Sequence, residues 1–157
     1  MFDYQGIFHV GVRVLDIESS MTSVGKGLGL TWAQLAERDM PYWTPASGPA
    51  VAHLKFVYSK EGPQHVELLE GSPGSVWDAT DAQGPGLHHS GVWVTDVAEA
   101  TEQAVAAGWT LLAANKSPED GYGTFSYVRS PEGFVLEPVN VVRRPFMEAW
   151  FAGEALA

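Results

Sequence analysis

The sequence predicts an α+β protein built from two copies of one β-α-β-β-β unit, and two observations carry this prediction. A short phrase occurs twice: residues 9–17 read His-Val-Gly-Val-Arg-Val-Leu-Asp-Ile, and residues 89–97 read His-Ser-Gly-Val-Trp-Val-Thr-Asp-Val. The same succession of helix and strand patterns then follows each copy. A period of about half the chain indicates one duplication rather than a solenoid of many short repeats.

The first unit is expected over about residues 5–71. Its opening strand, residues 7–14, places valines on one face and His9, Gly11 and Arg13 on the other. A helix over residues 17–26 begins after Asp16, which suits an N-cap, and ends at Gly27. Further strands are predicted at residues 30–36, 50–58 and 65–70, with the proline-rich segment 40–49 as a loop.

The second unit, about residues 86–142, follows a Gly/Pro/Ser-rich connector over residues 71–86. Its helix is expected between Asp96 and Gly108. Its strands are predicted at residues 87–94, 110–114, 124–129 and 134–139. The tail, residues 143–157, is amphipathic and is expected to form a short capping helix; residues 1–157 are expected to form a single domain.

Composition excludes several classes of function. The formal net charge is −10, which argues against nucleic-acid backbones and anionic membranes as partners. The chain has no cysteine, so disulfides and thiolate catalysis are excluded. The sequence shows no signal peptide and no long apolar stretch. We therefore expect a soluble, cytoplasmic protein whose partner is a small-molecule substrate, with no nucleic acid and no membrane.

Four polar residues on predicted strands form a candidate metal site. His9 and His89 occupy matching places in the two units, and Glu67 and Glu137 lie on their last strands. A lone strand histidine is more often a hydrogen-bonded core residue, but the matched pair favours metal ligation. Carboxylates in apolar strands require a partner or a metal. Two imidazoles and two carboxylates fit one divalent cation, with positions left for water or substrate.

With these motifs the sequence resembles the vicinal oxygen chelate superfamily, which includes glyoxalases, bleomycin-resistance proteins and extradiol dioxygenases. The resemblance rests on Phe-His-Val-Gly-Val, His-Val-Glu-Leu-Leu-Glu, Gly-Leu-His-His-Ser-Gly-Val and Pro-Glu-Gly-Phe-Val-Leu-Glu, in this order. It implies two βαβββ units in one eight-stranded, cup-shaped mixed sheet. It also implies a metal bound by His9, Glu67, His89 and Glu137, the ligands coming from the first and last strands of each unit.

Within the superfamily, Val-Glu-Leu-Leu-Glu and Gly-Pro-Gly-Leu-His-His resemble the methylmalonyl-CoA epimerase-like branch. In that branch a glutamate on the third strand of the first unit is thought to move a proton, and the matching position here is His53. We therefore expect His53 to act as catalytic base, since its ordinary pKa lies near neutrality; Glu137 is a second candidate catalytic residue. The alternative is that His53 is a strand histidine facing solvent.

Three further residues are expected to contact substrate. Arg13 and Trp93 lie four residues after the two repeated histidines, and Arg13 would pair an anionic group. Ser126 is expected to play a similar role in the second unit. The alternative for these residues is packing at the rim of the cup. His65 shares a face with Glu67 and either lines the cup or lies exposed at its edge.

The function expected on this basis is that of a metal-dependent epimerase, isomerase or lyase acting through an enolate on a small carbonyl or acyl-thioester substrate. The cofactor would be one divalent ion among Zn, Ni, Co, Mn and Fe, and the resemblance suggests a homodimer. One alternative is an Fe-dependent extradiol-type dioxygenase, against which the fourth ligand Glu67 argues. The others are a glyoxalase acting on glutathione adducts and a non-enzymatic small-molecule (drug) binding protein.

Overall fold

The computed structural model describes residues 2–156, which fall into two compact units interleaved along the chain. The His9 unit comprises residues 9–40, 52–88 and those from 145 onward. The His89 unit comprises the residues up to 8, 41–51 and 89–144.

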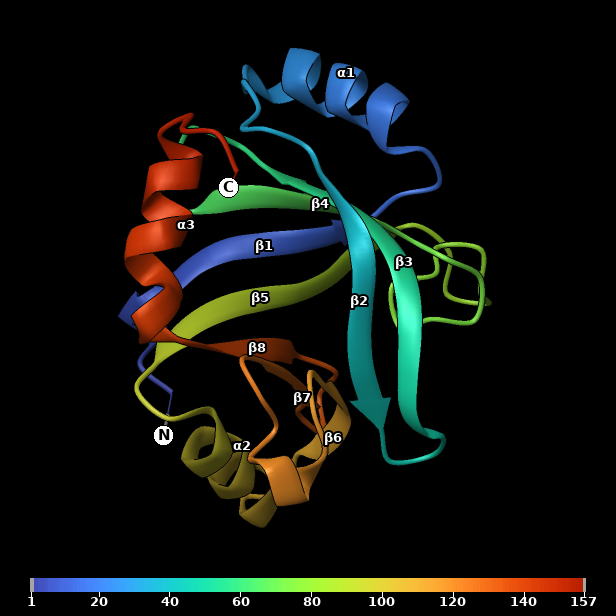
Figure 1. Cartoon of the computed structure of the whole chain (residues 1–157), viewed down its shortest axis with the longest axis vertical. Helices are drawn as coiled ribbons and strands as arrows, with labels where there is room; N and C mark the ends of the chain where they lie inside the picture. Colours follow the sequence, from blue (N-terminus) through green and yellow to red (C-terminus); the bar gives the residue numbers. More distant parts are fainter. Residues whose placement is uncertain (1, 157) are drawn as a thin grey trace. The chain divides into compact units, whose positions relative to one another are not determined.

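The order of elements is the predicted one, β-α-β-β-β twice, followed by a helix (Figure 1). The first half contains β1 (Ile7–Arg13), α1 (Ile17–Leu28), β2 (Ala36–Thr44), β3 (Gly48–Tyr58) and β4 (His65–Gly71). The second contains β5 (Gly86–Val94), α2 (Val97–Ala106), β6 (Thr110–Ala114), β7 (Ser126–Arg129) and β8 (Val135–Asn140), then α3 (Arg144–Phe151). Short 3₁₀ turns are η1 (Tyr4–Gly6), η2 (Pro118–Asp120) and η3 (Val141–Arg143).

The strands form one closed mixed sheet in the order β1-β4-β3-β2-β6-β7-β8-β5, which confirms the predicted fold class. The first and last strands of each repeat pair in parallel, β1 with β4 and β5 with β8. Their registers are equivalent, since Gly11 pairs with Glu67 and Gly91 pairs with Glu137. The duplication seen in the sequence is therefore repeated in the strand pairing.

Both repeat helices begin at the predicted aspartates. The Asp16 carboxylate accepts the Ser19 N–H at 2.8 Å, and Asp96 caps α2 in the same way through Glu99 N–H at 3.0 Å. The helix α1 ends later than predicted, at Leu28, and its C-cap is Gly29, which adopts a left-handed conformation with φ +68. Glycines inside a helix cost stability but do not stop it, so Gly27 was the wrong choice of terminus.

The largest difference from the prediction lies between residues 30 and 49. Instead of a strand at 30–36 and a loop at 40–49, β2 and β3 form a hairpin whose turn is closed by Ser47 N–H donating to Thr44 Oγ1 at 3.1 Å. Pro41 lies within β2, where it contributes a carbonyl that accepts from Asn115 Nδ2. A proline in a strand loses one donor only, and here the pairing of the remaining residues outweighs that loss.

Each repeat helix packs over one face of its own strands. In the His9 unit, α1 and the strands enclose a core of Val14, Ile17, Val57 and Leu68. In the His89 unit, α2 supplies Ala104 to a cluster with Val128 and Leu136. Because side chains alternate along a strand, the neighbouring residues point to the opposite face, away from α1 and α2, and the candidate ligands lie there. None of the helices within residues 2–156 is long and apolar enough to cross a membrane.

Candidate metal centre

The first half of the candidate site is a buried histidine–glutamate pair on adjacent parallel strands. His9 of β1 is fully buried and Glu67 of β4 is 4% exposed. His9 Nε2 lies 3.3 Å from Glu67 Oε2. The residue paired with Glu67 is Gly11, which has no side chain and so leaves room for the carboxylate to reach the imidazole two residues away.

The second half repeats this arrangement in the His89 unit. His89 of β5 and Glu137 of β8 are both buried, and His89 Nε2 lies 3.2 Å from Glu137 Oε2. Gly91 pairs with Glu137 as Gly11 pairs with Glu67. The sequence repeat has therefore preserved the ligand chemistry and also the small residue beside each carboxylate.

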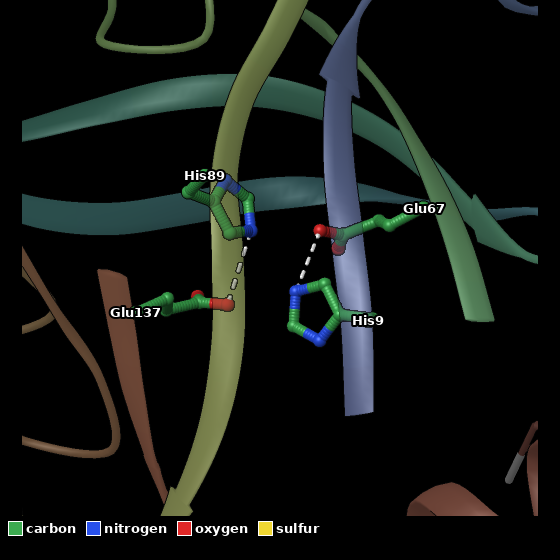
Figure 2. A group of neighbouring side chains, drawn as sticks. All are labelled: His9, Glu67, His89 and Glu137. Atoms are coloured by element: carbon green, nitrogen blue, oxygen red, sulfur yellow. Dashed lines mark ion pairs between the residues drawn. The ribbon is translucent and has the colours of Figure 1, made fainter. Parts of the chain in front are cut away.

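The four side chains meet the geometric requirement for sharing one cation. Each offers one ligand atom, and these atoms all lie within 4.8 Å of one another (Figure 2). Two neutral imidazoles and two carboxylates are donors typical of borderline divalent metals, and their charge balances that of M²⁺. Burying two ionised carboxylates without a compensating charge is costly, so the donor set fits a divalent metal.

Each histidine is also contacted by a tyrosine, a feature that the sequence analysis missed. Tyr58 pairs with Glu67 across the β3–β4 ladder, and its ring meets the His9 ring edge-on at 5.3 Å. Tyr127 lies 4.9 Å from the His89 ring. A possible sequence signal was that both tyrosines lie on the third strand of their unit, shortly before the glutamate strand.

His53 is not brought to the candidate ligands. Tyr58 shares the face of Glu67, and His53 is an odd number of residues away on the same strand, so it points to the opposite face. There its imidazole lies between Glu37 and Asp39, with Nε2 2.9 Å from Glu37 Oε1 and Nδ1 3.1 Å from Asp39 Oδ1. These two hydrogen bonds raise the pKa of His53 above its ordinary value.

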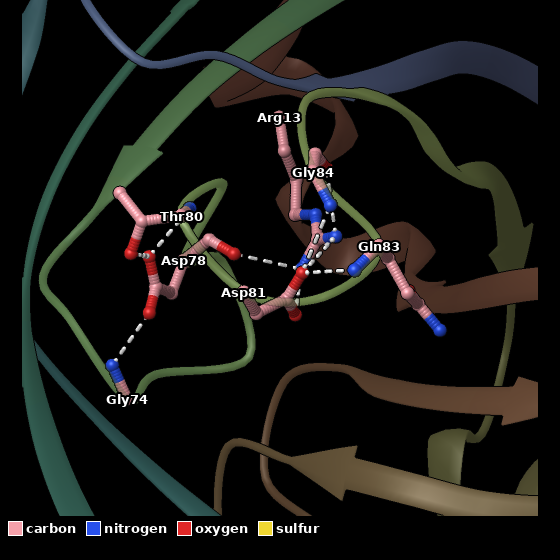
Figure 3. A network of polar contacts seen from close by, with 7 residues as sticks. All are labelled: Arg13, Gly74, Asp78, Thr80, Asp81, Gln83 and Gly84. Carbon is pink, nitrogen blue, oxygen red and sulfur yellow. Dashed lines mark hydrogen bonds and ion pairs between the residues drawn. The ribbon is translucent and has the colours of Figure 1, made fainter.

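Arg13 lies on the face of His9, as predicted, but its guanidinium holds the connector between the repeats (Figure 3). It forms a bidentate pair with Asp81 at 2.9 and 3.1 Å. It also donates to the carbonyl oxygens of Asp78 and Gly84, each at 3.0 Å. Expected as a binder of a substrate anion, Arg13 is 4% exposed and already holds an internal carboxylate.

The other two expected substrate contacts have packing partners. The Trp93 ring stacks on Phe8 with a centroid distance of 3.7 Å. Ser126 is fully buried, and its Oγ lies 2.7 Å from Thr101 Oγ1 of α2. Since Tyr127, the next residue, contacts His89, Ser126 points to the helix-covered face. Both residues therefore have packing partners, as the alternative interpretation expects, and their contact with a substrate stays a prediction.

His65 shares the face of Glu67, and the structure places its ring against the tail of the chain. His65 Nδ1 lies 2.7 Å from the Ser59 carbonyl oxygen, and its ring stacks on Phe151 at 4.0 Å. Burial lowers the pKa of His65 below its ordinary value. His65 is therefore held by the Ser59 backbone and by the tail of the chain.

Comparison with known families now identifies the class of protein. The model of the Glyoxalase/Bleomycin resistance protein/Dioxygenase superfamily matches residues 8–127, and the chain belongs to this superfamily. The match covers both repeated strands and ends before Glu137 and α3. No curated protein matches the sequence.

Solved structures share the fold at low sequence identity. A hypothetical protein from Bacillus halodurans is 21% identical with a TM-score of 0.61, the alignment covering 85% of this chain and 92% of that one. Methylmalonyl-CoA epimerase from Mycobacterium tuberculosis is 17% identical with a TM-score of 0.57, covering 89% and 92%. A methylmalonyl-CoA epimerase in complex with methylmalonyl-CoA and NH4+ is 18% identical with a TM-score of 0.54, covering 85% and 92%.

Proposed function

We propose that the chain is a divalent-metal-dependent enzyme of the epimerase, isomerase or lyase type, acting on a small carbonyl or acyl-thioester substrate. The observation that carries the proposal is the buried set of two His–Glu pairs, whose ligand atoms lie within 4.8 Å of one another. A drug-sequestering protein needs an apolar pocket but has no need of four buried metal-type donors.

In this proposal the imidazoles of His9 and His89 and the carboxylates of Glu67 and Glu137 hold the ion. When bound, the cation polarises a substrate carbonyl and makes the adjacent C–H more acidic. The imidazoles bind through Nε2, because that nitrogen faces the carboxylate in each pair. The tyrosine beside each histidine keeps its ring in place by aromatic contact.

We propose Glu137 as the residue that accepts the proton from the substrate carbon. Its carboxylate is one of the four donors that lie within 4.8 Å of one another, so it would stand beside a carbonyl group held at the ion. His89 Nε2 lies 3.2 Å from this carboxylate, so the two side chains face the same position. His53 takes no part in this scheme, because it points to the opposite face of β3 from Tyr58 and its ring nitrogens are engaged by Glu37 and Asp39.

The substrate class is supported by the fold neighbours. One similar structure is a methylmalonyl-CoA epimerase with methylmalonyl-CoA bound, so this fold accommodates an acyl thioester next to an acidic C–H in that protein. The chain here has the same fold and a complete donor set. We therefore propose acyl thioesters and 2-oxo compounds as the substrates to be screened first.

The test measures the metal-dependent exchange of a substrate C–H hydrogen for deuterium. NMR spectra of the substrate monitor this exchange in the presence of wild-type protein loaded in turn with Zn, Ni, Co or Mn. Exchange is expected in the wild type and lost in Glu137→Gln at saturating metal. Glu67→Gln removes the equivalent carboxylate of the other repeat, and we expect it to weaken metal binding but retain exchange once metal is saturating. The exposed Glu132→Gln is the control for charge removal alone. Exchange that persists in metal-saturated Glu137→Gln would contradict the assignment of the base.

Wild-type protein that binds metal but exchanges no substrate in the screen would contradict the enolate chemistry. Oxygen-dependent cleavage of a catechol by the Fe²⁺-loaded protein would instead indicate the dioxygenase reading. Tight binding of a drug-like molecule by metal-free protein would favour a binding protein.

A further inference from the structure

The tail helix α3 covers the face of the His9 unit that carries the candidate ligands. Trp150 meets the ring of Tyr58 edge-on at 5.1 Å, and Tyr58 in turn meets His9 at 5.3 Å. Phe151 packs on Tyr58 at 5.0 Å and on His65 at 4.0 Å. Because Tyr58 and Glu67 are cross-strand partners, these contacts place α3 over the ligand face and not over the face covered by α1.

The connector between the repeats and the helix α3 both border this face. The connector is fixed by the Arg13 guanidinium, which makes a bidentate pair with Asp81 and two bonds to backbone carbonyls. Such charge-assisted bonds are directional and costly to break. The contacts of α3 include the ring contacts above and two hydrogen bonds to Gln34, from Trp150 Nε1 at 2.9 Å and Leu156 N–H at 2.7 Å. Apolar ring contacts are non-directional and can be replaced by an apolar ligand.

The segment that leads into α3 is suited to bending. The Val142 side chain in the η3 turn is 76% exposed, and the hydrogen bond of its N–H, to Asn140 Oδ1 at 3.0 Å, lies within the turn itself. The helix itself spans eight residues, fewer than an isolated helix needs to be stable, so its stability depends on packing of Met147, Trp150 and Phe151. A short helix of this kind can detach by local opening while the strands beneath it stay folded.

From these observations we propose that residues 144–156 act as a gate: α3 swings away at η3 as a unit, uncovers Tyr58 and His65, and admits ligands to the buried His9–Glu67 pair. His9 is fully buried, so a small molecule can approach its ring only if a covering element moves. The inference deepens the proposed function, on which the identity of the admitted ligand rests. The opening of α3 itself does not depend on a metal.

Thiol labelling tests the opening directly, because the chain has no cysteine and each introduced cysteine is the sole thiol. Three variants are compared in metal-free protein, with a large excess of a chromogenic disulfide reagent. Met147→Cys lies on the buried face of α3, Phe146→Cys on its exposed face, and Val57→Cys in the core beneath α1. The exposed variant gives the rate for an open site, and the core variant gives the rate for global unfolding.

We expect Met147→Cys to react more slowly than Phe146→Cys but at least about tenfold faster than Val57→Cys, with little dependence on dilute urea, because local opening exposes little surface. Equal rates and equal urea slopes for Met147→Cys and Val57→Cys would overturn the gate, since α3 would then open only when the protein unfolds. A cysteine substitution could itself loosen α3, so amide hydrogen exchange of the wild type measures the opening without any substitution. Amides of residues 144–156 should exchange before those of β4, and simultaneous exchange would overturn the proposal.

Release of bound metal to excess chelator links the gate to the ligands. Trp150→Ala should accelerate release about tenfold or more, whereas Phe146→Ala on the exposed face of the same helix should leave the rate unchanged. Equal release rates in Trp150→Ala and wild type would overturn the role of α3 in admission. A protein that binds no metal would refute the proposed function, while the labelling experiment would still decide whether α3 opens.

Discussion

Tyr58 lies directly across the β3–β4 ladder from Glu67, and the edge of its ring meets the ring of His9. The same tyrosine is in contact with Trp150 and Phe151 of the tail helix. One side chain thus links a candidate metal ligand to the element that covers it. Tyr127 stands beside His89 in the other repeat.

Replacing Tyr58 by Ala should destabilise the fold by roughly 3–5 kcal/mol, the range for removing a large aromatic side chain from a core. Tyr58 is 4% exposed, so the substitution leaves a cavity between His9 and Trp150. Urea unfolding followed by circular dichroism measures the change. Tyr4→Ala, at a site 81% exposed, is the matched control and should stay within about 0.5 kcal/mol of wild type. Equal stabilities for the two variants would show that Tyr58 has no packing role.

The ion pair of Arg13 and Asp81 should make stability depend on acidic pH. The hydrogen bond from Arg13 lowers the pKa of Asp81 below its ordinary value. A carboxyl group with a depressed folded-state pKa stabilises the protein above its unfolded pKa, and this contribution is lost as the pH falls through the folded-state value. The stability difference between wild type and Asp81→Asn should therefore be full near neutral pH and shrink below about pH 4. A difference that stays constant down to the acid limit would contradict the pairing.

The stability contributed by His53 should depend on pH in the opposite direction from that of Asp81. Hydrogen bonds to Glu37 and Asp39 raise its pKa above the ordinary 6.5. A raised folded-state pKa stabilises the protein fully below the unfolded value, and the contribution is lost as the pH rises through the folded value. The His53 ring protons should titrate above 6.5 in NMR spectra, and the joint variant Glu37→Gln/Asp39→Asn should bring the titration back toward that value. A wild-type midpoint at or below 6.5 would mean that the two carboxylates do not hold the ring.

Thr101 and Ser126 form a buried pair of hydroxyl groups beneath α2, and removal of the Thr101 hydroxyl should destabilise the protein more than removal of the Ser126 hydroxyl. Thr101 Oγ1 lies 2.6 Å from the Val97 carbonyl oxygen and donates its one proton there, so Ser126 is the donor in their mutual bond. Ser126→Ala should cost about 1 kcal/mol, whereas Thr101→Val, which leaves the buried Ser126 hydroxyl without its acceptor, should cost about 1–3 kcal/mol. Chemical unfolding of the two variants measures the order, and the reverse order would contradict the donor assignment.

The repeat explains why the fold and the four candidate ligands could be predicted from the sequence. His9 and His89 begin similar stretches that agree at five of nine positions, and the glutamates lie on apolar strands where a carboxylate needs a partner. Strand alternation also placed Arg13 on the correct face. Alternation does not say what lies opposite a side chain, so the partner of Arg13 in the connector, Asp81, was not foreseen.

The positions of His53 and Ser126 could not be obtained from the sequence for a related reason. Each lies on a strand that was predicted approximately, but the face of a side chain depends on exact register, and a shift of one residue reverses it. Pro41 led to a separate error. Because proline was interpreted as a strand breaker, residues 40–49 were predicted as a loop and the β2–β3 hairpin was not predicted. The contacts of α3 join segments far apart in the chain, such as Trp150 and Gln34, and no local pattern encodes such a pairing.

The most direct test of the account is the metal content of protein purified without chelator or metal-affinity tag, measured by elemental analysis beside His9→Ala and His89→Ala. If the two His–Glu pairs share one ion, wild type should hold about one divalent metal per chain, and each variant should lose it. Two ions in wild type, with one retained in each variant, would show that the pairs bind separately. Wild type that remains metal-free after reconstitution would contradict the metal centre itself.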